Sequence, residues 1–279
     1  SMGDYYLEKK DNKNAKEYFQ KALAIDSEFI SSKRKIWRID EEEAGNDISS
    51  TEWSSDSTNA VNAFMTGYWQ FYNIHWSKAR EQFEKAVTID PEFAMPYLFL
   101  VFTPGDSARS VESKKIAEGL APTASQYERD MIEYYLYRMD NPDANLSSRI
   151  SKLKANYPYK PFVMITEAGD LYSKKEYKKA IDIYTTMWEQ FDFSPSLNML
   201  GYANMQLGNM DAAKSAFEDY IYNNFMHPNP YDSMGEYWEK MEKYQSAYDY
   251  YMMAYTMDST FSISKERADA LEDKKTPVK

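Results

Sequence analysis

The chain has 279 residues and a formal net charge of −11, from 44 acidic and 33 basic side chains. Apolar residues make up 43% and aromatic residues 16%, which is enough to bury a sizeable core and excludes general disorder. The absence of cysteine excludes disulfides, thiolate nucleophiles and cysteine-ligated metals. Because the chain is acidic and has no long run of Lys or Arg, it is not expected to bind nucleic acid.

No apolar stretch reaches the ~20 residues that a membrane span needs, so the chain is not expected to span a membrane. No signal peptide is present, but the opening Ser1-Met2 is typical of a cloning remnant, which leaves room for a removed targeting segment. The lack of cysteine and the abundance of Tyr, Asn and Lys favour an exported bacterial protein, periplasmic or at the cell surface. A cytoplasmic location is also compatible with the sequence.

A sparse pattern begins at the amino terminus, where Gly3 is followed twelve residues later by Ala15 and four residues after that by Phe19. The same offsets recur in three later copies, at Gly67/Ala79/Phe83, Gly201/Ala213/Phe217 and Gly235/Ala247/Tyr251. A weaker fifth copy has Ala168 in the glycine position, followed by Ala180 and Tyr184. Spacing that is kept while most other residues vary indicates a structural repeat, and the last two copies lie 34 residues apart.

Each copy is predicted to form a helical hairpin. Residues 81–89 carry apolar side chains at helical spacing, and Asp90-Pro91 ends that helix because proline does not fit a helix interior. Small glycine and alanine side chains would let the two backbones of a hairpin approach where they cross. The aromatic position is then expected to fill the space between successive hairpins.

The segments between the clear copies are degenerate. Residues 49–59 are rich in Ser, Thr and Asp and are expected to form a loop. Four further helices are expected, over residues 92–101, 106–119, 124–139 and 144–156. A charged closing helix and a disordered tail over 273–279 complete the predicted chain.

The Gly–Ala–aromatic spacing with a period of 34 resembles the tetratricopeptide repeat (TPR) family, with the degenerate middle repeats of bacterial members. The resemblance is closest over 60–91 and 196–259. It implies an all-α fold, a right-handed α-solenoid of stacked antiparallel helical hairpins, as a single domain over 1–272. Its clear repeats lie near 3–27, 60–91, 161–195, 196–228 and 229–259, and its degenerate parts are 28–59 and 94–158.

The resemblance also implies that the first helix of each hairpin lines a concave groove. The residues that share this face run from aromatic at the front to polar and acidic at the back. Several of these aromatic side chains could instead belong to the core, since aromatic residues dominate core burial. The candidate ligand-binding residues are Phe64, Met65, Tyr68, Tyr72, Tyr172, Asn198, Tyr202 and Met205.

TPR proteins that grip a chaperone's terminal carboxylate use Lys, Arg and Asn on these inner helices. In the four copies with a complete first helix, none of the corresponding positions carries Lys or Arg, so this chaperone-clamp role is not expected. The positions hold Val61, Phe64, Met65, Phe162, Ile165, Thr166, Pro195, Asn198, Met199, Asn229, Asp232 and Ser233.

Catalytic, metal and cofactor sites are not predicted. The two histidines, His75 and His227, fall in different repeats and form no zinc-type pattern, and no phosphate-binding glycine loop is present. A carboxylate-pair glycosidase is not excluded by composition, but helical-barrel enzymes of that kind have longer and less regular repeats. The chain is therefore interpreted as a non-enzyme.

The function predicted is an interaction scaffold that binds a peptide or protein segment in the aromatic groove. Two alternatives stay open: a cell-envelope glycan- or nutrient-binding protein, and the sensor or regulatory part of a longer protein. The sequence does not identify the partner or the oligomeric state.

Overall fold

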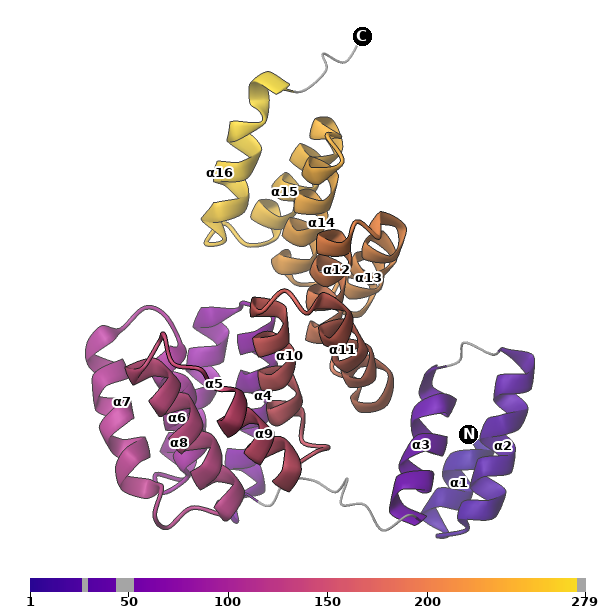
Figure 1. Ribbon diagram of the computed structural model, residues 1–279, viewed down its shortest axis with the longest axis vertical. Coiled ribbons are helices and arrows are strands. Elements are labelled where there is room, and N and C mark those ends of the chain that lie inside the picture. Colours follow the sequence, from indigo (N-terminus) through magenta and orange to yellow (C-terminus); the bar gives the residue numbers. More distant parts are fainter. Residues whose placement is uncertain (27–29, 44–52, 275–279) are drawn as a thin grey trace.

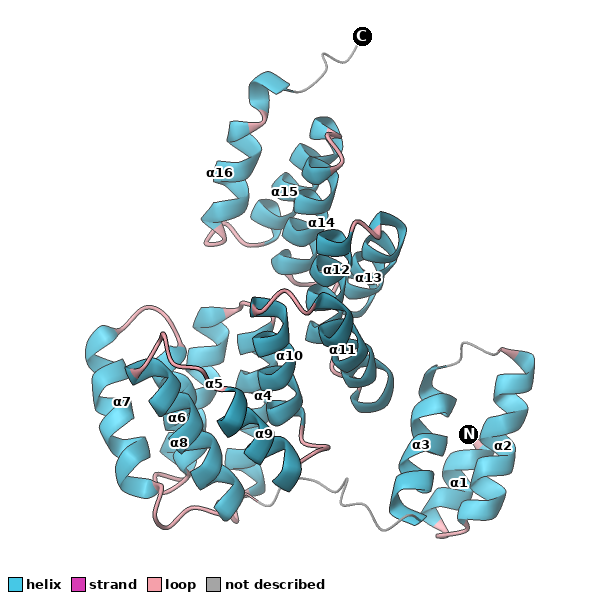
Figure 2. Ribbon diagram, in the orientation of Figure 1, coloured by secondary structure: helices cyan, strands magenta, loops and turns pink. Residues whose placement is uncertain are grey.

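The computed structural model describes residues 1–26, 30–43 and 53–274, and within these ranges the chain is helical and contains no strand (Figures 1 and 2). The last element is a short 3-10 helix, η1 (Glu272–Lys274). The α-helices are α1 (Met2–Glu8), α2 (Asn12–Ile25), α3 (Ile30–Glu43), α4 (Thr58–Tyr72), α5 (Trp76–Ile89), α6 (Ala94–Phe102), α7 (Ser107–Leu120), α8 (Gln126–Asp140), α9 (Ser147–Asn156), α10 (Pro161–Ser173), α11 (Tyr177–Phe191), α12 (Pro195–Leu207), α13 (Met210–Asn223), α14 (Pro228–Lys240), α15 (Tyr244–Met257) and α16 (Ser262–Ala270).

Neighbouring helices pack as pairs, and each pair packs against the next along most of the chain. The pairs α4–α5, α12–α13 and α14–α15 correspond to three of the predicted hairpins. One amphipathic pair cannot bury its apolar faces alone, so stacking of successive pairs builds a continuous core. The predicted all-α helical-repeat solenoid is confirmed.

The repeated glycine leaves room for the aromatic ring of its own hairpin, a contact that the sequence spacing did not predict. A Cβ atom at Gly201 would lie 2.5 Å from the ring of Phe217, and one at Gly235 would lie 2.5 Å from the ring of Tyr251. The aromatic ring of the second helix therefore lies directly on the glycine of the first helix. The ring of Phe217 also packs on Met234 and Tyr237 of the next hairpin, as the sequence predicts. The repeat alanines, such as Ala213, are fully buried.

The turn inside each clear hairpin has a left-handed residue seven positions after the repeat's first slot. These residues are Lys10, Ile74, Lys175, Gly208 and Glu242. Of the five, only one is glycine, the residue that adopts this conformation without strain. Ile74, with φ 61°, is the most unusual because a β-branched side chain is disfavoured there.

The degenerate middle region forms the four helices that the sequence predicts, α6 to α9, with ends displaced by only a few residues. Helix α6 is apolar around its whole circumference, and seven of its nine residues are buried. The predicted loop at 49–59 lies partly outside the described residues. Within the described part, Trp53 packs on Phe64 and Phe162, and the backbone N–H of Ser54 donates to Glu128 Oε2.

Helix α3 packs on α11, far along the chain, while α1 and α2 extend from it (Figure 1). The guanidinium of Arg34 donates to the carbonyl oxygens of Trp188 and Glu189 at the end of α11 and pairs with Asp192 at 2.6 Å. Trp37 meets Phe191 edge-on beside it. The aminoterminal helices are thus attached to the array through the carboxyl end of a distant helix.

The last helix, α16, covers the end of the stack as expected for a polar closing helix. Its Ala268 and the following Leu271 are buried together with Ala247 and Tyr251. Of the predicted disordered tail over 273–279, residues 273–274 belong to η1, and 275–279 lie outside the described residues.

Candidate functional site

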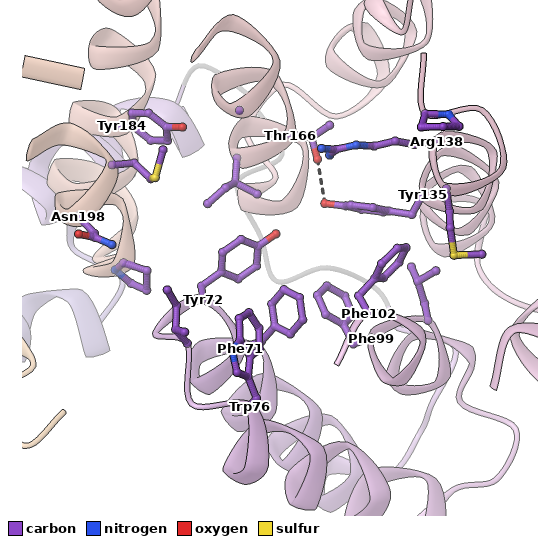
Figure 3. Close-up of a pocket in the computed structure, with 18 residues that line it drawn as sticks. Phe71, Tyr72, Trp76, Phe99, Phe102, Tyr135, Arg138, Thr166, Tyr184 and Asn198 are labelled. Carbon is purple, nitrogen blue, oxygen red and sulfur yellow. Dashed lines mark hydrogen bonds between the residues drawn. The ribbon is translucent and has the colours of Figure 1, made fainter. Parts of the chain in front are cut away.

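The inner helices of five successive pairs surround a cavity of about 690 Å³, here called the apolar cavity (Figure 3). Helices α4, α6, α8, α10 and α12 each contribute to its wall, because the stack curves and brings their inner faces together. The lining residues are Phe71, Tyr72, Ile74, Trp76, Leu98, Phe99, Phe102, Tyr135, Arg138, Met139, Pro142, Ile165, Thr166, Gly169, Tyr184, Pro195, Asn198 and Met199.

The glycine of α10, Gly169, leaves room for the cavity. Gly169 is exposed, and a Cβ atom built on it would have no neighbour within 4 Å. Large rings form the opposite wall, where Phe71 packs edge-on against Trp76 and Phe99. The cavity is therefore a built hollow with apolar sides, of a volume typical of ligand sites, ~300–1,000 Å³.

A few polar groups face this apolar surface. Thr166 Oγ1 donates to the carbonyl of Phe162 at 2.7 Å, so the Tyr135 hydroxyl, 2.9 Å from Thr166, donates to that oxygen. Figure 3 shows the hydroxyl of Tyr72 and the guanidinium of Arg138 directed into the cavity. Burial raises the pKa of Tyr72 well above its ordinary value, so the phenol stays neutral at physiological pH.

Asn198 supplies the clearest unpaired group. Its side chain lies on the opposite side of the cavity from Arg138 in Figure 3 and is only 7% exposed. Its Oδ1 atom is buried and has no hydrogen-bond partner. In Figure 3 the amide nitrogen of Asn198 is turned toward the cavity and Oδ1 away from it, so the side chain offers a ligand an N–H donor.

A second cavity of about 450 Å³, here called the acidic cavity, adjoins the first. It is formed by α12, α14, the turn before α16 and α16 itself. The residues lining both cavities are Ile74, Trp76, Asn198 and Met199. The remaining residues of the acidic cavity are Tyr202, Asn229, Asp232, Glu236, Thr260, Phe261, Ser262, Ile263 and Arg267.

One guanidinium serves both carboxylates of the acidic cavity. Arg267 Nη1 pairs with Asp232 and lies 2.5 Å from Glu236 Oε1. Asp232 also accepts a hydrogen bond from Ser264 at 2.5 Å. Burial raises the pKa of Glu236, with Arg267 acting in the opposite direction.

A contact between distant parts of the chain lies at the turn between α4 and α5. The turn between α4 and α5 meets the ends of α13 and α14, where the Tyr220 hydroxyl donates to Asn73 Oδ1 at 2.8 Å. Next to this bond, His75 Nε2 and His227 Nδ1 lie 3.3 Å apart. The sequence places the two histidines in different repeats, and only the curvature of the stack brings them together. Within the described residues, no group of three potential metal ligands is found.

The predicted site residues fall in three kinds of place. Tyr72 and Asn198 line the apolar cavity, and Asn198 and Tyr202 line the acidic one. Phe64 and Tyr68 are 0% and 2% exposed and lie in the core, stacked on Phe162.

The other three predicted residues line neither of these cavities. Met65 is 40% exposed on α4, and Tyr172 packs its ring on Tyr177. Met205 packs on the core around Phe217.

Sequence reasoning missed the contributions of α6 and α8. Phe99, Phe102, Tyr135 and Arg138 come from the degenerate region, where no repeat spacing marks the inner face. The uniformly apolar sequence of α6 was a signal of deep burial. Arg138 introduces a cation that the twelve clamp positions lack.

No helix among the described residues is long and apolar enough to cross a membrane. The tetratricopeptide repeat family matches the chain over residues 1–29 and 194–225, which are two of the repeats read from the sequence. No curated protein matches the chain significantly.

The chain is similar to three solved structures. A chain of the APC/C hetero-tetramer Cut9–Hcn1 is 14% identical with a TM-score of 0.50, covering 94% of this chain and 52% of that one. This chain thus spans about half the length of that relative. Yeast Tom70 is 13% identical with a TM-score of 0.49, over 95% of this chain and 60% of Tom70. A tetratricopeptide repeat protein from Parabacteroides merdae is 10% identical with a TM-score of 0.45, covering 97% of this chain and 96% of that one.

Proposed function

The chain is a tetratricopeptide-repeat protein, and from this premise we propose that it is a non-enzymatic scaffold that binds a segment of a partner protein in its concave face. The observation that carries the proposal is the apolar cavity, which the inner helices of five pairs form together. A fold alone does not determine function, which depends here on the chemistry of this surface.

The apolar cavity suits the large apolar side chain of a protein segment. Rings of Phe71, Trp76 and Phe99 offer contact area without requiring hydrogen bonds. The amide nitrogen of Asn198, which Figure 3 shows turned toward the cavity, can donate to a backbone carbonyl of the same segment. An extended peptide supplies both an apolar side chain and a carbonyl oxygen within a few ångströms, so one short segment satisfies both features.

Binding is favoured over catalysis because the apolar cavity lacks a group suited to proton transfer near neutral pH. Its ionisable lining residues are three tyrosines and one arginine. Burial raises the pKa of Tyr72 and of Tyr184 well above the usual value, far from the range of an effective general base.

A glycan- or nutrient-binding role is the second candidate, and the aromatic lining of the apolar cavity favours it. Sugar rings stack on aromatic faces, but each sugar also presents several hydroxyl groups. The polar groups of the apolar cavity are few, namely Tyr72, Tyr135, Arg138, Thr166 and Asn198, together with Tyr184. This balance favours a segment rich in apolar side chains over a sugar chain.

Selection from a random peptide display library on the purified full chain tests the proposal. Gly169→Leu would place a side chain in the apolar cavity without a clash, since nothing lies within 4 Å of its Cβ position. Gly119→Leu is the matched control, because Gly119 is also a helical glycine with no neighbour within 4 Å but lines neither cavity.

The expected result is that selected peptides bind the wild type and Gly119→Leu equally and bind Gly169→Leu at least tenfold more weakly. Both variants should melt at or slightly above the wild-type temperature, because leucine favours a helix over glycine by up to ~1 kcal/mol. Enrichment of no peptide, or equal binding by Gly169→Leu, contradicts the proposal. A glycan array on the same three proteins tests the second candidate.

A further inference from the structure

We propose that the acidic cavity selects a positively charged side chain, Lys or Arg, close in sequence to the apolar residue held in the apolar cavity. The inference rests on the proposed function, since both cavities are taken to hold the same segment. It commits to one kind of occupant, a peptide that combines a large apolar residue with a cationic one.

The two cavities adjoin and share part of their wall, so one segment lying across that wall can reach both. Ile74, Trp76, Asn198 and Met199 belong to both walls. A segment reaching from the apolar to the acidic cavity passes Asn198, whose amide nitrogen is turned toward the apolar cavity in Figure 3. This N–H group can donate a hydrogen bond to a backbone carbonyl of the segment.

The acidic cavity carries one negative charge more than its own residues neutralise. Asp232 and Glu236 share the single guanidinium of Arg267, and every other residue of its wall is uncharged. Asp232 is well satisfied, because it also accepts from Ser264 and its side chain is only 6% exposed. Glu236 is the carboxylate with more open access, at 31% side-chain exposure.

Partial burial makes this excess charge costly to the free protein. Desolvation raises the pKa of Glu236, and nearby Asp232 adds to that rise. An incoming ammonium or guanidinium would replace the lost hydration with a charge-assisted hydrogen bond. A ligand carboxylate would instead meet two carboxylates and be repelled.

The charge of the whole chain acts in the same direction. With a net charge of −11, the protein attracts cationic segments during their approach and repels acidic ones. The expected selectivity is therefore opposite to that of a surface built to hold a carboxylate. It also predicts that binding weakens as salt concentration rises.

A defined peptide array tests the inference even while the natural partner is unidentified. Its members are acetylated, amidated peptides of alanine and glycine with one phenylalanine and one variable residue placed one to four positions away on either side. The variable residue is Lys, norleucine or Glu. Norleucine keeps the aliphatic chain of lysine and removes its charge, so the comparison isolates the electrostatic contribution.

Dissociation constants are measured on the full chain by fluorescence anisotropy at 20 and 300 mM salt. At the best spacing and low salt, the Lys peptide is expected to bind about fivefold or more tightly than the norleucine peptide and the Glu peptide most weakly, in line with ~1 kcal/mol for a partly exposed charge pair. The Lys preference should shrink at 300 mM salt.

Two protein variants locate the preference. Glu236→Gln should abolish it, whereas Glu242→Gln, which changes the net charge equally at an exposed turn outside both cavities, should keep it. If Glu236→Gln unfolds the chain, the comparison of Lys, norleucine and Glu peptides on the wild type still tests whether a positive charge is preferred.

The outcomes separate the inference from the proposed function. Peptides that bind through phenylalanine, are weakened by Gly169→Leu and show no preference for Lys overturn the inference and leave the scaffold proposal standing. A Lys preference that Glu242→Gln loses as fully as Glu236→Gln also overturns it, because the preference then reflects net charge alone. If no peptide of the array binds, both are contradicted.

Discussion

His227 Nδ1 lies 3.3 Å from His75 Nε2, although 152 residues separate them in the chain. The ring of Trp69 packs edge-on against His227. Burial lowers the pKa of both histidines, to about 4 for His227, and Lys78 adds to the lowering while Asp258 opposes it at His75. The neutral pair joins the turn after α4 to the start of α14.

The histidine pair predicts that stability is lost toward acid pH. The folded chain has lowered histidine pKa values, so between about pH 4 and the unfolded value of ~6.5 the unfolded chain binds more protons. The free energy of unfolding is then fully retained above pH ~6.5 and falls as the pH drops toward 4. The contribution is on the order of 1 kcal/mol after allowance for solvent screening of a partly exposed ring.

Urea unfolding at several pH values between 7 and 4.5 measures this loss, and His227→Asn is the comparison. His227 is the N-cap residue of α14, and asparagine is well suited to that position. The substitution removes one of the two imidazoles. The variant should lose less stability than the wild type over this range. Parallel curves for the two proteins would show that the histidine pair does not couple the fold to pH.

Tyr220 is predicted to hold the same contact together through hydrogen bonds. Its hydroxyl donates to Asn73 and accepts from Asn229 at 2.9 Å, and the side chain is fully buried. Tyr220→Phe should lower the free energy of unfolding by ~1–3 kcal/mol, because it leaves both amides without this partner. Tyr237→Phe, at a buried ring outside this network, should change the urea midpoint little. Equal effects of the two substitutions would contradict the prediction.

Gly201 is predicted to tolerate no side chain, in contrast to Gly169. The Cβ of Gly201→Ala would press on the ring of Phe217, and overpacking of this kind costs ~1–3 kcal/mol. Gly169→Ala meets no neighbour within 4 Å and should stabilise its helix by ~0.5–1 kcal/mol. Thermal unfolding of both variants checks the opposite signs. Adding Phe217→Leu should recover part of the loss in Gly201→Ala, and failure to recover any would count against the packing explanation.

Ile74 is predicted to lower the stability of the fold through its left-handed backbone and to contribute its side chain to the walls of both cavities. Its φ of 61° is a conformation that costs L-residues roughly 1–2 kcal/mol and that asparagine tolerates better. Ile74→Asn should therefore raise the free energy of unfolding by ~0.5–1 kcal/mol and weaken peptide binding, since Ile74 lines both cavities. Glu242→Asn changes the equivalent turn, at φ 57°, outside both cavities. It should stabilise similarly and leave binding unchanged.

Arg34 is predicted to attach the aminoterminal helices to α11. Lysine cannot reproduce the fork of donors that reaches Trp188 and Glu189, so Arg34→Lys should expose the interface. Amide hydrogen exchange in α3 should become about tenfold faster, corresponding to ~1.4 kcal/mol, with α14 and α15 unaffected. Arg149→Lys, at an exposed pair with Glu133, is the control and should leave exchange in α3 as it is. Unchanged exchange in α3 for Arg34→Lys would contradict the prediction that Arg34 attaches the aminoterminal helices to α11.

The repeated hairpins could be predicted because they are local. Gly201 and Phe217 lie sixteen residues apart and touch within one helix pair, so their spacing is written in the sequence. The helices of the degenerate region were predictable for the same reason, because turns and apolar periodicity are short-range signals. The direction in which Phe217 packs was not, because spacing alone does not say which neighbour a ring meets.

The amino-acid sequence by itself determined the helical hairpins, their period and the acidic character of the chain. Tertiary structure alone decided that Tyr72 faces a cavity while Tyr68, one turn earlier, lies in the core. It also brought Arg138, Asn198 and Glu236 around two adjoining cavities and joined His75 to His227. The reason is that the curvature of the stack accumulates from a small rotation at each pair, and those rotations depend on side-chain packing between helices that no short stretch of sequence contains.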